Sequence, residues 1–207
     1  TPQQFYLGLD RYLVSEGFAL RLVPVNTNVD DAEQGAIQLT ESVYDKIMNK
    51  YKWGNIGNAS YLDPDSYRYL TFFLSSIFGE TAQNLLQQGK KKEAHDVVLN
   101  AYQNLPKKVY QMGEAMSYIS LLDAMYQTGE SAKAKEISLR YLKYIKEHMH
   151  YLSSNHLIKD VTSERNARLA LVGLQRIKMI GDQYKDADVQ NATAELWKQY
   201  SYVFGEE

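Results

Sequence analysis

The sequence contains no cysteine, only four prolines and four histidines, and a formal net charge of only −2 over 207 residues. Without cysteine the chain has no disulfide, no thiol nucleophile and no Cys-based zinc or iron–sulfur site. With a net charge near zero, the chain does not have the excess of Lys and Arg expected of a protein that binds nucleic acid or an anionic membrane. The longest apolar run covers 169–174, far short of the roughly 20 residues that cross a bilayer. We therefore predict no nucleic-acid partner and no membrane insertion.

Hydrophobic residues make up 44% of the chain and charged residues 23%. These proportions are typical of a folded protein, and the length suffices for a sizeable core in one domain or two small ones. Tyrosine is the one surplus, with 17 copies. The chain opens with Thr1 rather than Met, so we expect a processed chain or a piece of a longer protein.

The composition changes near residue 62. Before it lie clusters of Asn, Asp and Gly at 26–31 and 53–58, which are typical of loops. Residues 20–25 indicate a short extended segment, and Pro24 confines that segment to the edge of a sheet. One helix is predicted over 37–51 from apolar residues at every fourth position. We therefore predict an irregular N-terminal segment, 1–62, whose single helix packs on a helical domain, 63–207.

The second part of the chain predicts helix after helix. Asp63 and Pro64 are a strong start signal, because Asp caps a helix and Pro fits its first position. Glycine, proline and the helical spacing of apolar residues delimit the rest. The predicted helices cover 63–88, 91–105, 112–128, 131–152, 163–180 and 186–203, with a break at Gly181 and Asp182. The predicted fold class is all-α.

An internal repeat links two of these helix pairs. Gly89 and Gly129 are each followed five residues later by an alanine, Ala94 and Ala134. The first copy continues with Val98, Ala101 and Pro106, whereas the second has Ser138, Tyr141 and Lys146. This spacing resembles the tetratricopeptide repeat, in which Gly ends the first helix and a small residue lets the two helices pack closely.

The repeat predicts stacked antiparallel helical hairpins of tetratricopeptide-like type. Its period of 40 residues exceeds the usual length of about 34. A pair of ordinary helical hairpins can also place Gly and Ala in this way, so that alternative stays open. The last helix pair is a weak third copy, because Gly181 is followed five residues later by Asp186 instead of alanine.

No constellation of residues points to catalysis. The histidines, His95, His148, His150 and His156, lack the spacing of a metal site, and no nucleophile-elbow, zinc-protease, phosphate-loop or dinucleotide motif occurs. Asp123 alone interrupts an apolar helix face, and we expect it at a rim that reaches solvent or a basic neighbour. A hydrolase that combines Asp123 with His148 is the enzymatic alternative. We predict no enzyme activity, no metal and no cofactor for this chain.

Two blocks carry a resemblance to a known family. They read Asp-Arg-Tyr-Leu-Val-Ser-Glu-Gly-Phe-Ala-Leu-Arg-Leu-Val-Pro-Val at 10–25 and Tyr-Lys-Trp-Gly-Asn at 51–55, and are followed by Tyr-Leu-Asp at 61–63 and the hairpin that contains Gly89 and Ala94. Together they resemble the C-terminal soluble region of a family of multi-spanning membrane proteins common in Bacteroidetes. The membrane half of that family is similar to GT-C-type protein O-mannosyltransferases, which use lipid-linked sugars.

The resemblance implies a periplasmic, repeat-like domain that acts beside its own upstream membrane region. The family's catalytic acidic residues lie upstream of the part that this chain matches, so the resemblance assigns no catalytic residue here. Within the first block, Arg11, Glu16 and Arg21 are candidates for an ion-pair network that ties the N-terminal segment to the helices.

Two functions follow as expectations. The first is a non-catalytic module that binds a protein or peptide segment, or presents a substrate, because stacked helical hairpins commonly bind such segments. The alternative is a carbohydrate-binding domain that stacks aromatic rings on a glycan. Its candidate residues are Tyr12, Trp53, Tyr61 and Tyr110.

Overall fold

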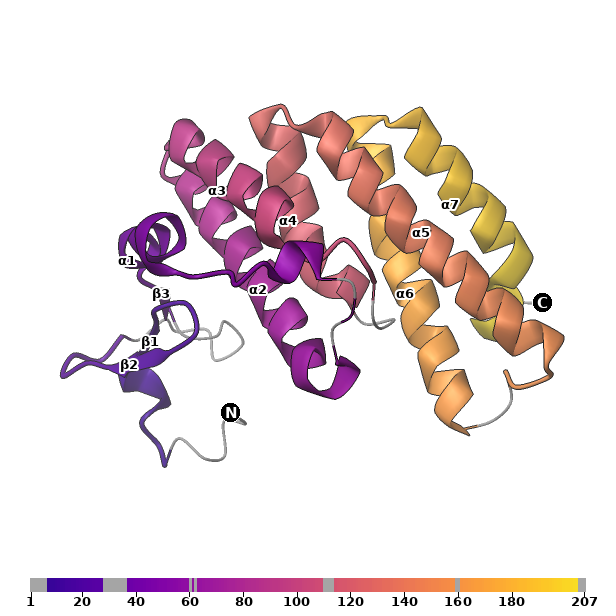
Figure 1. The fold of residues 1–207 in the computed structure, drawn as a ribbon, viewed down its shortest axis with the longest axis horizontal. Helices are drawn as coiled ribbons and strands as arrows, with labels where there is room; N and C mark the ends of the chain where they lie inside the picture. The colour runs from indigo at the N-terminus through magenta and orange to yellow at the C-terminus, as the bar shows by residue number, and fades with distance from the viewer. Residues whose placement is uncertain are drawn as a thin grey trace.

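The computed structural model describes residues 7–27, 37–59, 61, 63–109, 114–158 and 161–204. Within them the chain is all-α apart from three very short strands (Figure 1). The α-helices are α1 (Thr40–Asp45), α2 (Pro64–Gln87), α3 (Lys91–Asn104), α4 (Glu114–Thr128), α5 (Ser131–Ser154), α6 (Val161–Tyr184) and α7 (Ala187–Tyr200). The predicted fold class is confirmed, and Pro64 is the first residue of α2 as its sequence context indicates.

Helices α2 to α7 form three hairpins, α2–α3, α4–α5 and α6–α7, each joined by a turn of two or three residues. Helix α2 packs on α4, and α4 packs on α6, so these three helices form one layer. Helices α3, α5 and α7 each pack against the first helix of their own hairpin. All three turns lie along one edge of the molecule, the upper edge in Figure 1. This is the order of contacts expected of stacked hairpins, and the tetratricopeptide type stays a prediction.

Each hairpin turn contains a residue in the left-handed conformation. Gly89 and Gly129 have φ of +75° and +93°, and Lys185 takes the same place in the third turn with φ of +55°. The next residue always donates its amide to a carbonyl five positions back, with N–O distances of 2.8, 2.8 and 3.0 Å for Lys90, Glu130 and Asp186. This is the bond pattern that satisfies the last carbonyls of a helix. The third hairpin therefore repeats the first two, with Lys185 in the glycine position.

The predicted break at Gly181 and Asp182 is wrong. Helix α6 continues through both residues to Tyr184. A β-carbon on Gly181 would lie 2.8 Å from Cγ1 of Val189 on α7, so the missing side chain is what lets the two helices meet. The roughly 1 kcal/mol that glycine costs inside a helix is small beside that overlap.

Small residues also lie at the other two hairpins, but on the second helix of each. Ala94 and Ala134, five residues after the turn glycines, are fully buried. Val98 and Ala101 are fully buried too, and Pro106 is buried just beyond the end of α3. In the degenerate second copy Ser138 and Tyr141 are buried, whereas Lys146 is exposed and pairs with Glu195. The repeat residues on the second helices are therefore mostly buried, whereas the turn glycines Gly89 and Gly129 are exposed.

The N-terminal segment forms a small sheet in the order β2-β1-β3. Strand β1 (Leu13–Ser15) pairs antiparallel with β2 (Leu20–Leu22) and parallel with β3 (Ile37–Gln38). The extended segment expected at 20–25 is confirmed as an edge strand, although it is shorter. The predicted helix over 37–51 begins only at Thr40, because residues 37 and 38 pair with β1. Helix α1 then continues into a π-helical turn, Lys46–Lys50.

The N-terminal segment and the hairpins share one hydrophobic core. Val43, Ile47 and Ile56 belong to the same buried cluster as Phe78 on α2 and Val97 on α3. Short 3-10 helices at Asp10–Tyr12, Ile56–Asn58 and Ser201–Phe204 complete the described structure. Within the described ranges, no helix combines the length and the apolar character needed to cross a membrane.

Candidate functional site

A polar cluster centred on Asp123 joins the three helices of the first layer. Asp123 lies on α4, half-buried, and its Oδ2 accepts hydrogen bonds from Gln83 on α2 at 2.6 Å and from Gln127 at 2.7 Å. Its Oδ1 accepts from Tyr184 at 2.5 Å and from Gln183 at 3.2 Å, both on α6. One carboxylate is therefore the common acceptor of side chains from all three hairpins. Gln127 and Gln183 are exposed, so the cluster opens to solvent.

Two tyrosines extend this cluster toward the third hairpin. The rings of Tyr126 and Tyr184 stack with centroids 4.4 Å apart and planes within 8°. Tyr126 donates to Asp186 at 3.0 Å, and Asp186 also caps α7 by accepting from the amide of Val189. Burial, and then the bond to Asp123, raise the pKa of Tyr184 to about 12. Burial and Asp186 likewise raise the pKa of Tyr126 well above its ordinary value, so both phenols are proton donors at neutral pH.

The described groups of the cluster are side-chain amides, carboxylates and phenols that bond one another. The expected basic neighbour of Asp123 is not among its described bonds, which come from amides and one phenol. His148 lies on a different helix, α5, where its ring stacks on Tyr144. Burial lowers the pKa of His148, and its Nε2 is buried with no hydrogen-bond partner among the described residues. The structure therefore shows no contact between Asp123 and His148 in the part of the chain it describes.

Metal ligands do not gather in this region either. Among the described residues, no three His, Asp or Glu side chains lie close enough together to hold an ion. Of the other histidines, His95 contacts the carboxylate of Glu130 at 2.8 Å, and His156 has a positive φ of 56° at the end of α5.

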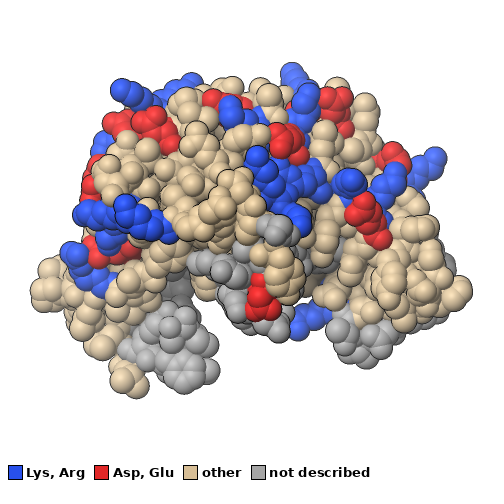
Figure 2. Space-filling model, in the orientation of Figure 1, with Lys and Arg blue, Asp and Glu red and all other residues tan. Residues whose placement is uncertain are grey.

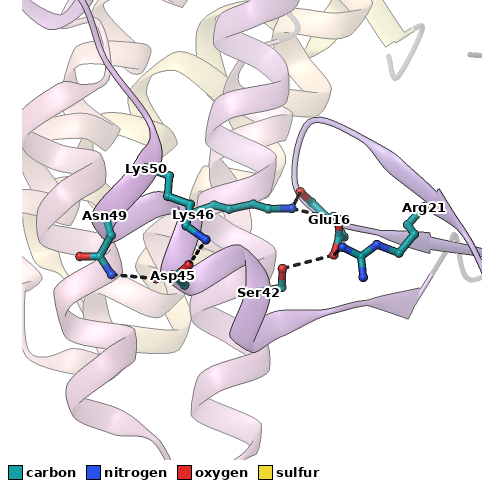
Figure 3. A network of polar contacts seen from close by, with 7 residues as sticks. All are labelled: Glu16, Arg21, Ser42, Asp45, Lys46, Asn49 and Lys50. Atoms are coloured by element: carbon teal, nitrogen blue, oxygen red, sulfur yellow. Dashed lines mark hydrogen bonds and ion pairs between the residues drawn. The ribbon is translucent and has the colours of Figure 1, made fainter.

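A second polar network lies at the N-terminal sheet and is centred on Glu16 (Figure 3). The Glu16 carboxylate contacts Lys46 at 3.1 Å, Arg21 at 2.7 Å and the Ser42 hydroxyl at 3.3 Å. The hydrogen bond from Lys46, aided by the charge of Arg21, lowers the pKa of Glu16 despite its burial. The predicted pair of Glu16 with Arg21 is therefore present, and Lys46 and Ser42 provide the link to the helices. The Arg11 side chain is exposed and is not among the groups described in this network.

The two blocks that carry the family resemblance meet beside this network. Phe18 packs on Tyr51, Tyr51 packs edge-on against Trp53, and Trp53 packs on Phe78 of α2. The successive ring centroids are 5.1, 5.7 and 5.3 Å apart. A row of aromatic rings thus connects the exposed Phe18 with the core.

The four aromatic residues proposed for glycan binding are placed differently from one another. Tyr61 is exposed, whereas Tyr12 is half-buried beside β1. Trp53 is half-buried between two other rings, so its contacts are those of a packing residue. Tyr110 lies outside the described residues.

Comparisons of the chain with family models, with curated proteins and with solved structures found no significant match.

Sequence reasoning identified Asp123 but missed its amide partners. Gln87, Gln127 and Gln183 each lie two residues before the left-handed residue of their hairpin turn. Gln83 and Asp123 occupy a second shared position, six residues before Gly89 and Gly129. The first pattern extends to the third hairpin only when that copy is aligned on Lys185, because Lys185 gives no local sign that it replaces a glycine.

Proposed function

We propose that the chain is a non-catalytic module that binds an extended peptide segment across the ends of α2, α4 and α6. The observation that carries this proposal is the Asp123 cluster, a continuous set of amide and phenol groups that spans three hairpins at the surface. Extended peptides expose backbone N–H and C=O groups at regular intervals. A row of side-chain amides, each with a donor and an acceptor, suits that ligand.

The position of the cluster supports a binding role over a purely structural one. The exposed amides of Gln127 and Gln183 come from equivalent places in successive hairpins. Repeated positions on stacked units give a ligand the same group at successive steps along the array. Asp123 holds both amides through bonds to their Nε2 atoms and so fixes their orientation before a ligand arrives. Such preorganisation reduces the entropy lost on binding.

The charged surface near the hairpin turns fits a ligand of mixed or neutral charge. Figure 2 shows Lys, Arg, Asp and Glu side by side along that edge. Many of these charges are already paired, as in Lys90 with Glu41 and Lys135 with Asp188. Paired charges attract a charged ligand weakly, so hydrogen bonding carries the recognition.

The family resemblance extends the proposal to a location. It supports a module on the periplasmic side of a membrane, next to an upstream half similar to a GT-C glycosyltransferase. There the module would hold a protein segment that the membrane half modifies.

A peptide selection tests the proposal. A phage-displayed library of random peptides is selected on the purified chain, and enriched peptides are measured by fluorescence polarisation. We expect the double variant Gln127→Ala, Gln183→Ala to bind about tenfold more weakly, since each neutral hydrogen bond contributes roughly 0.5–1.5 kcal/mol. Gln199→Ala, which removes an exposed amide from α7, is the matched control and should bind like the wild type.

Two results would overturn the proposal. One is that the library yields no enriched peptide, and the other is that the double variant binds enriched peptides as tightly as the wild type. A glycan array on the same samples tests the carbohydrate alternative. Glycan binding without peptide enrichment would favour that alternative and count against ours.

A further inference from the structure

Among the described residues, the N-terminal sheet has no strand paired with the outer edge of β2. The amides of Val23 and Glu16 bond to the carbonyls of Tyr12 and Ala19, with N–O distances of 2.8 Å in both cases. These two bonds lie on either side of the pair formed by Val14 and Arg21, which are opposite each other in the ladder. Since hydrogen-bonded and non-bonded pairs alternate in an antiparallel ladder, Arg21 directs its N–H and C=O toward β1.

The same alternation directs the backbone groups of Leu20 and Leu22 away from β1. No strand among the described residues lies on that side, because β2 is the outer strand of the sheet. All three residues of β2 are exposed, with relative exposures of 43% for Leu20 and 58% for Leu22. Unpaired N–H and C=O groups on such an edge are a ready template for a further strand.

The residues around this edge add an apolar surface. Phe18 and Val25, on either side of β2, are 49% and 66% exposed. Folded proteins usually protect an open edge with lysines, inward-pointing charges or a covering loop. Here Arg21 is the only charged residue of β2, and it points back toward Glu16. The described edge therefore combines free hydrogen-bonding groups with exposed leucines.

The charges near the edge define the partner further. Arg21 and Lys46 share the single carboxylate of Glu16, and the Arg21 side chain remains 57% exposed. The local balance is therefore positive, and an acidic residue opposite Arg21 would complete it. A second copy of this chain, paired antiparallel about Arg21, would instead place two arginines directly opposite each other. Like charges in that position are destabilising, so self-pairing in this register is disfavoured.

We propose that the β2 edge binds an extended segment of a partner protein as a fourth, antiparallel strand. The segment has an apolar–acidic–apolar core, with its acidic residue opposite Arg21 and its apolar residues opposite Leu20 and Leu22. Main-chain bonds to Leu20 and Leu22 supply affinity, and Arg21 supplies specificity. This surface is distinct from the Asp123 cluster, and the inference does not depend on the peptide site proposed there.

A titration followed by NMR tests the inference on the whole chain. The probe is the capped peptide Thr-Val-Glu-Val-Thr, and the matched control is Thr-Val-Lys-Val-Thr. We expect the Glu peptide to shift the amide signals of Leu20, Arg21 and Leu22. The Kd of the Lys peptide should be at least about fivefold higher. Leu22→Pro, which removes an outward donor, should abolish the shifts. Leu7→Lys, which changes an exposed apolar residue outside β2, should leave them unchanged.

The variant Arg21→Gln keeps the test decisive if Leu22→Pro does not fold. It retains the backbone of β2 and should bind the Glu and Lys peptides equally. The inference is overturned if the Glu peptide does not shift the β2 amides, or if Arg21→Gln still prefers it. It is also overturned if sedimentation shows a dimer that Leu22→Pro dissociates, because the edge then binds a second copy. The variants Gln127→Ala and Gln183→Ala should not affect these shifts, which separates the two proposals.

Discussion

The hydroxyl of Tyr51 occupies the space in which a β-carbon of residue 17 would lie. Gly17 also has φ of +85°, a conformation that costs other residues free energy. The Tyr51 ring cannot easily move aside, because it packs against both Phe18 and Trp53. Residue 17 therefore has two separate reasons to be glycine. Its contact with Tyr51 also brings together the two blocks of the family resemblance.

The first prediction separates these two reasons. Gly17→Ala should lower the free energy of unfolding by about 1–3 kcal/mol, measured by urea denaturation. Gly54→Ala is the control, since Gly54 has φ of +55° but no atom within 4 Å of its missing β-carbon. In a Tyr51→Phe background Gly17→Ala should cost less, because the hydroxyl is gone. Additivity of the two changes within about 0.5 kcal/mol would contradict a direct contact.

The second prediction concerns acid stability. Because Lys46 and Arg21 lower the pKa of Glu16 below its ordinary value of 4.5, the folded state binds that proton less readily than the unfolded chain. The ion pairs of ionised Glu16 therefore stabilise the folded state fully above pH 4.5, and this stabilisation is lost as the pH falls through the lowered pKa. Glu16→Gln should reduce the urea midpoint at neutral pH and make the midpoint less sensitive to acid.

The control for this prediction is Glu147→Gln. Glu147 forms only an exposed pair with Lys143, at 3.9 Å, so its removal should change the urea midpoint little at any pH. If the midpoints of Glu16→Gln and wild type fell in parallel below pH 4.5, Glu16 would not be the source of the acid sensitivity.

The third prediction tests the equivalence of the three hairpin turns. Lys185→Gly should raise the free energy of unfolding by about 1 kcal/mol, because a left-handed residue with a side chain costs about that much. Gly129→Ala, at the matching place in the second hairpin, should lower it by a similar amount. Thermal unfolding measures both. A loss of stability in Lys185→Gly would contradict this prediction. It would show that the Lys185 side chain stabilises the fold by more than the left-handed backbone conformation costs.

The fourth prediction concerns the packing of α2 on α4. A β-carbon on Gly79 would lie 2.8 Å from the backbone nitrogen of Leu121, and the nearby Ser75 and Ser117 hydroxyls are 2.6 Å apart. Gly79→Ala should lower the free energy of unfolding by about 1–3 kcal/mol, because backbone cannot move aside as a side chain does. The gain in helix propensity, about 1 kcal/mol, only partly offsets that loss.

Gly173→Ala is the matched helical control. Its β-carbon would lie 3.0 Å from the methyl group of Ala115 and 4.0 Å from Cδ1 of Ile145, both side-chain atoms, so the gain in propensity should roughly balance the strain. Urea denaturation should therefore give a clearly lower free energy of unfolding for Gly79→Ala than for Gly173→Ala. Equal stability of the two variants would mean that α2 and α4 can separate at little cost.

Local signals predicted most of the helical fold. Pro64 and the turn glycines Gly89 and Gly129 lie within a few positions of the helix boundaries they predict. Helix caps, turn residues and apolar spacing act over about one helical turn, so their effects can be predicted from the sequence. The boundary at Gly181 failed because there the glycine serves a contact with Val189 on the next helix and not a turn.

The candidate sites were predicted less completely. Asp123 was identified by its polarity on an apolar face, but two of its partners, Gln83 and Tyr184, lie 40 and 61 residues away in the sequence. Lys46 is likewise 30 residues from Glu16. No local rule connects residues at such distances, so the partners are known only once the helices pack.

The sequence by itself determined that this chain is helical, where its first two hairpins turn and that Ala94 and Ala134 lie at their cores. The tertiary structure alone decided which polar groups meet and which strand edge has no partner among the described residues. Helix formation depends on propensities and caps within a few residues, whereas the Asp123 cluster and the β2 edge depend on how distant segments are brought together. Both surfaces that we propose for binding are products of that second step.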